Sequence, residues 1–581
     1  MGIRVRHSEP VGNSQGGGAP TPSNSSFAIR ARNIPADWPP LAALVLSLAY
    51  YYAVPAPLLA LPGLLAFLGL TWLRLDLALC VLPLTFPFWF VPKHIGGNVV
   101  FPLSEIALAV CFAVALVREA RSLIRRPPVR AALTKTRVGQ PARTAEAAGP
   151  HCATPGEEEA SGRLLRVAAA LTSLLARLGR TGAPVLIGAA LLLAGTALGV
   201  VIARRPHEAL RAFRWEVVEP LLYAALVLVY LRGRHVRLLV GAFLGAALLL
   251  ATLAAIQVFW LHVTFLPVAQ GNRLIPYAAP EGAAARATAF IFGSGNTLGA
   301  WMARALPLAL ALGLAPRGMA RRWRLLSLVV TVASIPALLW SDSRGALIAA
   351  ALACAVVGVL SLPRPRWAIG VSVAGALVAL VALLANRAAV LNALLTGHGG
   401  SGEVRTLVWL AGWHMIRDHV LLGIGPDQFL YYYSNLYTRH PYWILFQNGH
   451  RTLAWTEPNL AQPHNLVLDL WLSGGILALA GFAVVLAAFW RGCWLVGRAA
   501  RIQAATSSLD AASEGLQPAP ARAPVILGRD SAAWSAALAL GLGASVLAGV
   551  LHGMVDSAYF EPDLALLFWW AIASLVLTVG S

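Results

Sequence analysis

The chain has 581 residues, of which 58% are hydrophobic and only 12% are charged, and its mean hydropathy is +0.68. Soluble domains carry about twice that share of charge, so the composition excludes an ordinary soluble enzyme and indicates a membrane protein. The net charge of +20 comes almost entirely from arginine, because lysine occurs only at Lys93 and Lys135. In a membrane protein such an excess belongs first to cytoplasmic loops, and we expect no nucleic-acid partner.

The cysteine pattern excludes two further classes. Five cysteines are scattered along the chain without Cys-x-x-Cys or Cys/His spacing, so neither a disulfide framework nor a zinc site is expected. Acidic pairs at ligand spacing are also absent from the loops expected outside. We therefore expect neither a metal nor a cofactor.

In chain order, residues 1–38 are polar and rich in Gly, Ser and Pro, and they predict a disordered cytoplasmic tail rather than a signal peptide. Apolar windows of about 20 residues then predict an all-α polytopic transmembrane bundle of about 12–14 spans. The expected divisions are N-terminal transmembrane helices (39–117), a cytoplasmic basic insert (118–182), central transmembrane helices (183–385), an extracytoplasmic loop (386–464) and C-terminal transmembrane helices (465–581).

The arginines give the orientation. With both termini in the cytoplasm, most arginine clusters fall inside, as the positive-inside rule requires, and the loop 386–464 faces outward. Arg286, Arg344 and Arg405 lie near the outer surface instead. Their convergence from separate loops indicates an anionic ligand, since the planar guanidinium suits phosphate oxygens.

Four segments in order carry a family resemblance. They are Arg286 through Asn296, Ser341-Asp-Ser-Arg344-Gly-Ala346, Arg405-Thr-Leu-Val-Trp409 with Gly423-Ile-Gly425-Pro426, and His464-Asn465 followed by Gly475. Together they resemble the O-antigen ligase and polymerase (Wzy-type, WaaL-like) superfamily of bacterial membrane glycosyltransferases. The likeness spans roughly 286–490, with weaker likeness around His552 and Asp556.

The resemblance implies a GT-C-like enzyme in the bacterial inner membrane, with its active site facing the periplasm or exterior. Its implied partners are membrane lipids, an undecaprenyl-pyrophosphate-linked glycan donor and a lipid or glycan acceptor that supplies a hydroxyl. No metal is implied, because arginines can neutralise the departing pyrophosphate.

The expected catalytic residues are His464, Arg405 and Arg286. The two arginines would hold phosphate, and His464, near a helix N-terminus that favours neutral imidazole, would act as general base. Each also has a plainer explanation, such as an interfacial arginine or a histidine at headgroup level.

The remaining candidates are expected to bind substrate, and several have an equally good structural role. Arg344 fits a local ion pair with Asp342 as well as a ligand contact, and Asn465 fits a helix cap. Asp556 fits a solvated loop carboxylate. Asn296 and Trp409 complete the substrate-binding set: Arg344, Asn296, Asn465, Trp409 and Asp556.

Three alternative functions remain open. A polymerase of the same superfamily would share the donor and differ in the acceptor, with His464-Asn465 favouring a ligase slightly. A solute transporter would need repeated halves and polar residues at mid-membrane, which the sequence does not display. A non-catalytic scaffold or flippase would also suit the arginines, but it should tolerate loss of His464.

Overall fold

The computed structural model describes residues 37–95, 99–125, 182–260, 265–270, 273–278, 286–315, 319–362, 370, 401–434, 436–438, 460–513, 529–557 and 559–579. Most of the expected tail and residues 126–181 of the basic insert lie outside these ranges. Nearly all of residues 367–385, at the end of the expected central transmembrane helices, lie outside them too. So do residues 386–400 and 439–459 of the outer loop. The expected domain boundaries therefore remain predictions.

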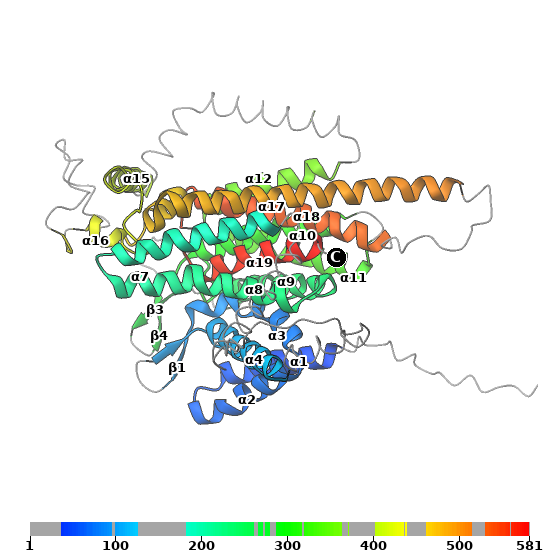
Figure 1. Ribbon diagram of the computed structural model, residues 1–581, viewed down its shortest axis with the longest axis horizontal. Helices are drawn as coiled ribbons and strands as arrows, with labels where there is room; N and C mark the ends of the chain where they lie inside the picture. The colour runs from blue at the N-terminus through cyan, green and yellow to red at the C-terminus, as the bar shows by residue number, and fades with distance from the viewer. Residues whose placement is uncertain are drawn as a thin grey trace, which may run out of the picture.

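The fold is a bundle of long helices, which confirms the predicted all-helical membrane architecture (Figure 1). The α-helices are α1 (Trp38–Ala53), α2 (Pro57–Leu73), α3 (Leu75–Val81), α4 (Leu103–Arg125), the helix Gly182–Ile202, α7 (Pro206–Phe213), α8 (Glu219–Tyr230), α9 (Val236–Ala255), α10 (Gly295–Gly313), α11 (Arg321–Trp340), α12 (Arg344–Leu360), α15 (Ser401–Asp418), α16 (Phe429–Tyr433), α17 (Leu466–Ser513), α18 (Arg529–Gly553) and α19 (Pro562–Val579).

Short irregular helices join or extend these elements. They are the 3₁₀ turns η1 (Leu82–Leu84), η2 (Phe86–Phe90) and η4 (Gly233–His235), and the π-helical turns η3 (Arg214–Val218) and η5 (Ile256–Trp260). Two small antiparallel hairpins, which the sequence did not predict, complete the described structure. β1 (Lys93–Ile95) pairs with β2 (Val99–Phe101), and β3 (Phe265–Gln270) pairs with β4 (Arg273–Ala278).

Six helices in the described ranges are long and apolar enough to cross a membrane: Gly182–Ile202, Gly233–Trp260, Arg321–Trp340, Leu466–Gln503, Ala532–Gly553 and Pro562–Val579. Shorter apolar helices, Pro57–Leu73, Leu75–Leu84 and Arg344–Leu360, accompany them, and part of the chain expected to hold spans lies outside the described ranges. The apolar stretch 76–92, within the expected N-terminal transmembrane helices, breaks into 3₁₀ turns at Pro83 and Pro87, because proline lacks the N–H that a helix needs. Helix α10 carries Asn296 and Arg304, which lower its hydropathy.

The core is formed by α10, α18 and α19, which pack against α8, α9, α11, α12 and α17. Helix α19 is the most enclosed of the candidate spans, because 89% of the residues in its apolar stretch are buried. Its Trp570 stacks on Phe243 of α9 with ring centroids 4.5 Å apart. Figure 1 shows these helices running in nearly the same direction, whereas α15 is seen end-on, across the bundle, near α16 and the start of α17.

A glycine-rich break in α17 attaches α15 to the bundle. The helix is interrupted at Gly474 and at Gly475, whose φ is 64°. The turn after α15 lies against this break: Ile424 N donates to Leu472 O at 2.7 Å, and Ile476 N donates to Leu421 O at 3.2 Å. These bonds fix the end of α15 relative to the first turns of α17.

Replacing Gly475 with alanine is expected to destabilise the protein by about 1–3 kcal/mol, because its left-handed backbone disfavours any side chain. A methyl group would also overlap the carbonyl oxygen of Leu421. Thermal unfolding in detergent measures the effect. Gly358→Ala in α12 is the matched control, since a Cβ there meets no heavy atom within 4 Å. Equal melting temperatures for the two variants would contradict this account.

Candidate functional site

One polar pocket collects most of the predicted residues. It has about 1210 Å³ of empty volume, and its wall includes Arg286, Asn296, Arg344, Arg405, His464 and Asp556. Five separate segments supply them: the approach to α10, the α11–α12 turn, α15, the residues before α17 and the turn between α18 and α19. The site is therefore assembled by the packing of the bundle, which brings together residues that are far apart in the sequence.

Arg286 is held by oxygen atoms on two elements. Its Nε donates to the carbonyl of Ser341 at 3.0 Å, and its Nη2 donates to Asn296 Oδ1 at 2.6 Å and to the carbonyl of Asp342 at 3.1 Å. Asn296 is thereby a direct partner of Arg286 at the start of α10, whose N-cap is Ser294. These bonds position the guanidinium group but do not neutralise its charge.

The three pocket arginines keep their charge available. Among the residues that the structure describes, no carboxylate forms an ion pair with Arg286, Arg344 or Arg405. The local ion pair between Arg344 and Asp342 considered from the sequence is therefore not formed. Arg344 begins α12, where the helix dipole adds positive potential to the guanidinium group. The pocket is built to attract an anion.

His464 and Asp556 form a hydrogen-bonded pair on one wall of the pocket. Nδ1 of His464 lies 3.1 Å from Oδ1 of Asp556, although 92 positions separate the two residues. If Nδ1 carries the proton toward the carboxylate, Nε2 is left as the basic nitrogen. The His464 side chain is 33% exposed, so a ligand in the pocket can reach it. The arrangement is that of a histidine base oriented by a carboxylate.

The environment of Asp556 keeps it ionised. Burial by itself would raise the pKa of Asp556, but the hydrogen bond from His464, the charges of His552 and His464 and the N–H of Ser557 together lower this pKa to about 2. At neutral pH the carboxylate is therefore charged, and it stabilises the imidazolium that forms when His464 takes up a proton.

The backbone at His464 has an unusual conformation. Its φ is 51°, in the left-handed region that costs a non-glycine residue roughly 1–2 kcal/mol. Helix α17 begins only two residues later, at Leu466, and Asn465 caps it by accepting hydrogen bonds from Val467 N and Leu468 N at 3.1 and 3.2 Å. The Asn465 amide also donates to the carbonyl of Met554 at 3.0 Å. This residue links the His464 turn to the Asp556 turn.

Asn465 and Trp409 lie behind the pocket wall. Trp409 Nε1 donates to the carbonyl of His464 at 3.4 Å, so both residues support His464. The structure thus brings Arg286, Asn296, Arg344, Arg405, His464 and Asp556 to one pocket and leaves Asn465 and Trp409 outside its lining. Their expected roles toward a substrate remain predictions.

His552 is a pocket residue that was not among the candidates chosen from the sequence. Its Nε2 lies 3.7 Å from Oδ2 of Asp556, on the side opposite His464. A signal was present in the sequence, because His552 lies at the end of α18, four positions before Asp556 in the turn that follows. Gly345 makes room for this ring: a Cβ there would lie 3.2 Å from His552 Cδ2.

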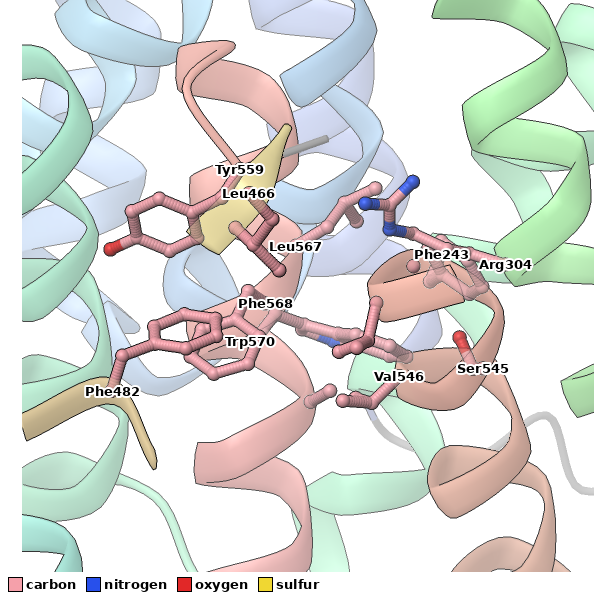
Figure 2. Close-up of a pocket in the computed structure, with 13 residues that line it drawn as sticks. Phe243, Arg304, Leu466, Phe482, Ser545, Val546, Tyr559, Leu567, Phe568 and Trp570 are labelled. Atoms are coloured by element: carbon pink, nitrogen blue, oxygen red, sulfur yellow. The ribbon is translucent and has the colours of Figure 1, made fainter. Parts of the chain in front are cut away.

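A second cavity, in the bundle core, has a different character (Figure 2). Aromatic rings of Phe482, Tyr559, Phe568 and Trp570 dominate its wall, with Arg304 at one side. Arg304 donates from Nη1 to the carbonyl of Ala300 at 2.8 Å within α10. An apolar lining offers few hydrogen bonds to replace those that a pyrophosphate makes with water. The polar pocket is therefore the candidate active site.

The aromatic segment of the outer loop packs onto neighbouring helices. Tyr432 and Tyr433 are buried, and the guanidinium of Arg204 lies 3.6 Å from the ring centre of Tyr432. Arg211 of α7 pairs with Asp427 at 3.4 Å, just before α16. These contacts hold α16 against α7 and the link that joins the helix Gly182–Ile202 to α7, which gives Tyr432 a structural role.

Comparison with known proteins agrees with this geometry. Residues 329–483 match the family model described as O-antigen ligase. This match, over about a quarter of the chain, supports the O-antigen ligase and polymerase superfamily that the sequence motifs resemble. The matched segment contains Arg344, Arg405 and His464, and the family implies a membrane glycosyltransferase or ligase activity. Arg286 and Asp556 lie outside the match and join the site through the fold. No curated protein matched the chain.

Proposed function

We propose that this protein transfers a glycan from an undecaprenyl-pyrophosphate donor to an acceptor hydroxyl on the outer face of the cytoplasmic membrane. One observation carries the proposal. Three arginines without carboxylate partners in the described structure share a pocket with a histidine that a carboxylate orients. A diphosphate leaving group needs the arginines, and a hydroxyl nucleophile needs the histidine.

Each group has a defined task in the transfer. His464 removes the proton from the acceptor hydroxyl as its oxygen attacks the anomeric carbon, and Asp556 stabilises the resulting imidazolium. The bond between that carbon and the phosphate oxygen breaks, and its electron pair remains on the pyrophosphate. Arg286, Arg344 and Arg405 stabilise this negative charge where it develops, which is the interaction that lowers a transition-state barrier most.

The length of α11 supports the outer location. Its N-terminal turn carries Arg321, Arg322 and Arg324, whereas its last residue, Trp340, adjoins the pocket turn at Ser341. Twenty residues span about 30 Å, the thickness of the hydrocarbon core. If the Arg321 cluster obeys the positive-inside rule, the pocket lies on the opposite, extracytoplasmic side.

The test is glycan transfer by the purified protein in nanodiscs, with a polyprenyl-diphosphate glycan as donor. A lipid acceptor and a second donor molecule are offered separately, because a ligase glycosylates the first and a polymerase extends the second. Because arginines supply the positive charge, activity is expected to persist in EDTA. Failure to consume the donor with either acceptor would refute the proposal. Strict dependence on a divalent ion would refute charge neutralisation by arginine alone.

A further inference from the structure

Helix α15 and the turn that follows it expose an apolar surface that the transfer mechanism does not use. This α15 apolar surface consists of five exposed residues: Leu410 and Trp413 on the helix, and Val420, Leu421 and Leu422 in the turn. Leu421 is 70% exposed. Exposed apolar residues that gather in one place mark a contact with a membrane or with another protein, so this surface needs a partner.

The depth of the turn follows from its hydrogen bond to α17. Ile476 N donates to Leu421 O at 3.2 Å, so the two residues lie at the same level of the bundle. Arg491 is the first charged residue after Ile476 and lies fifteen positions later, which is about 22 Å of helix. If Arg491 lies at the cytoplasmic boundary, as the positive-inside rule requires, a hydrocarbon core of about 30 Å extends outward past Ile476. The turn then lies at the level of the outer leaflet.

The backbone of the turn is suited to that depth. Hydrocarbon offers no water, so the polar groups of a non-helical segment need partners within the protein. The carbonyl of Val420 accepts from Trp471 Nε1 at 2.8 Å, and that of Leu421 accepts from α17. The N–H of Ile424 donates to the carbonyl of Leu472 at 2.7 Å. Helix α17 thus pairs the backbone of the turn while its leucine side chains stay exposed.

Helix α15 has the orientation of a helix that lies on a membrane. It runs across the helices that are expected to cross the bilayer (Figure 1), so its axis lies close to the membrane plane. The ring of Trp413 lies 6.4 Å from that of Trp471 in the first turns of α17, and tryptophan favours the membrane interface. Ile476, on the candidate span Leu466–Gln503, is exposed as well. The α15 apolar surface therefore continues the lipid-facing surface of α17.

We propose that the α15 apolar surface is embedded in the outer leaflet of the membrane, where lipid acyl chains cover it. The same helix carries Arg405, which lines the polar pocket. Embedding the turn fixes α15 relative to the bilayer, and it holds Arg405 at the level where a lipid-linked diphosphate lies. This consequence for Arg405 rests on the proposed glycan transfer, whereas the embedding itself does not.

Electron paramagnetic resonance tests the embedding without any substrate. A nitroxide label is attached at Leu421→Cys in the full chain, after alanine has replaced the five native cysteines. The protein is placed in nanodiscs of phosphatidylethanolamine and phosphatidylglycerol. We expect the label to be readily accessible to oxygen, which concentrates in hydrocarbon, and poorly accessible to a water-soluble nickel chelate.

Leu436→Cys is the matched control, because Leu436 is a leucine of the same outer loop and is 66% exposed. The neighbouring ring of Tyr437 packs on Tyr431 with ring centres 5.0 Å apart. The guanidinium of Arg205, which follows the helix Gly182–Ile202, lies 5.5 Å from the ring centre of Tyr431. This part of the loop is therefore beyond the end of a membrane span, and the nickel chelate should reach its label.

Two results would overturn the embedding. Equal access of the nickel chelate to the labels at Leu421 and Leu436 would place the turn in water. Low access of both reagents to the Leu421 label would mean that protein covers the turn. Dipolar broadening between labels in a nanodisc with two copies would then identify the cover as a second copy, and its absence would identify another part of this chain.

The consequence for Arg405 is tested by Leu421→Asp, because a charge is costly in hydrocarbon. We expect kcat/KM for the polyprenyl-diphosphate donor to fall about tenfold, the smaller end of the loss from one hydrogen bond to a charged group. Leu421→Phe, which stays apolar, and Leu436→Asp, which adds the same charge elsewhere in the loop, should retain transfer.

The outcomes separate this inference from the proposed function. If the Leu421 label lies in lipid but Leu421→Asp transfers glycan at the full rate, Arg405 does not depend on the embedded turn and that consequence is wrong. If the label lies in lipid and the unaltered protein transfers no glycan to either acceptor, the embedding stands and the proposed function is wrong.

Discussion

Replacing His464 with alanine is expected to lower the rate of glycan transfer by about 10²–10⁴-fold, the contribution of a positioned general base. The pocket has two described histidines, and only the ring of His464 lies within hydrogen-bonding distance of a carboxylate, at 3.1 Å from Asp556. Alanine removes that ring. Donor binding should change little, because the arginines remain in place. The measurement is the initial rate at saturating donor, with KM determined in parallel.

Two further variants define what His464 contributes. Asp556→Asn should lower kcat in the same direction, because the amide cannot stabilise the imidazolium. The double variant should be scarcely slower than His464→Ala alone, since residues that act as one unit are not additive. His207→Ala is the matched control, because His207 lies on α7, is exposed and does not line the pocket. An unchanged transfer rate in His464→Ala would mean that His464 is not the general base.

The segments that meet at the pocket could be predicted from the sequence, because their residues carry a recognisable charge or helix-capping pattern. Arginines that violate the positive-inside rule pointed to an outer anionic site, and Arg286, Arg344 and Arg405 do line one pocket. The sequence placed His464 near a helix N-terminus with Asn465 as a cap, and α17 begins at Leu466. Long apolar windows likewise predicted the membrane helices, since hydropathy depends on composition alone.

The remaining features depend on distant contacts, which local patterns do not encode. The left-handed backbone at His464 and its hydrogen bond to Asp556 arise only when the α18–α19 turn packs beside the start of α17. The interruption of α17 at Gly475 is explained by the turn at Leu421 that lies against it. The break after α3 is of the same kind, because Pro83 and Pro87 end a helix inside an apolar stretch.

Arg405→Ala is expected to lower kcat/KM for transfer by about 10–100-fold, because one hydrogen bond to a charged group is worth about 1.5–3 kcal/mol. Arg405 is the cleanest of the pocket arginines to test. Arg286 is hydrogen-bonded to Ser341, Asp342 and Asn296, so its removal would also loosen the start of α10 and the turn that follows α11. In the described structure Arg405 has no such partner, so its loss should not alter thermal stability.

The matched control is Arg417→Ala, which removes an exposed arginine from the same helix outside the pocket. It should leave both transfer and donor binding unchanged, although it alters the net charge equally. Arg405→Lys separates charge from geometry: lysine keeps the charge but not the planar pair of donors, so it should recover only part of the lost activity. Equal losses in Arg405→Ala and Arg417→Ala would mean that the outer surface attracts the donor through its overall charge. Selective loss at Arg405 would instead identify a guanidinium that contacts the diphosphate, because only a direct contact depends on the position of one side chain.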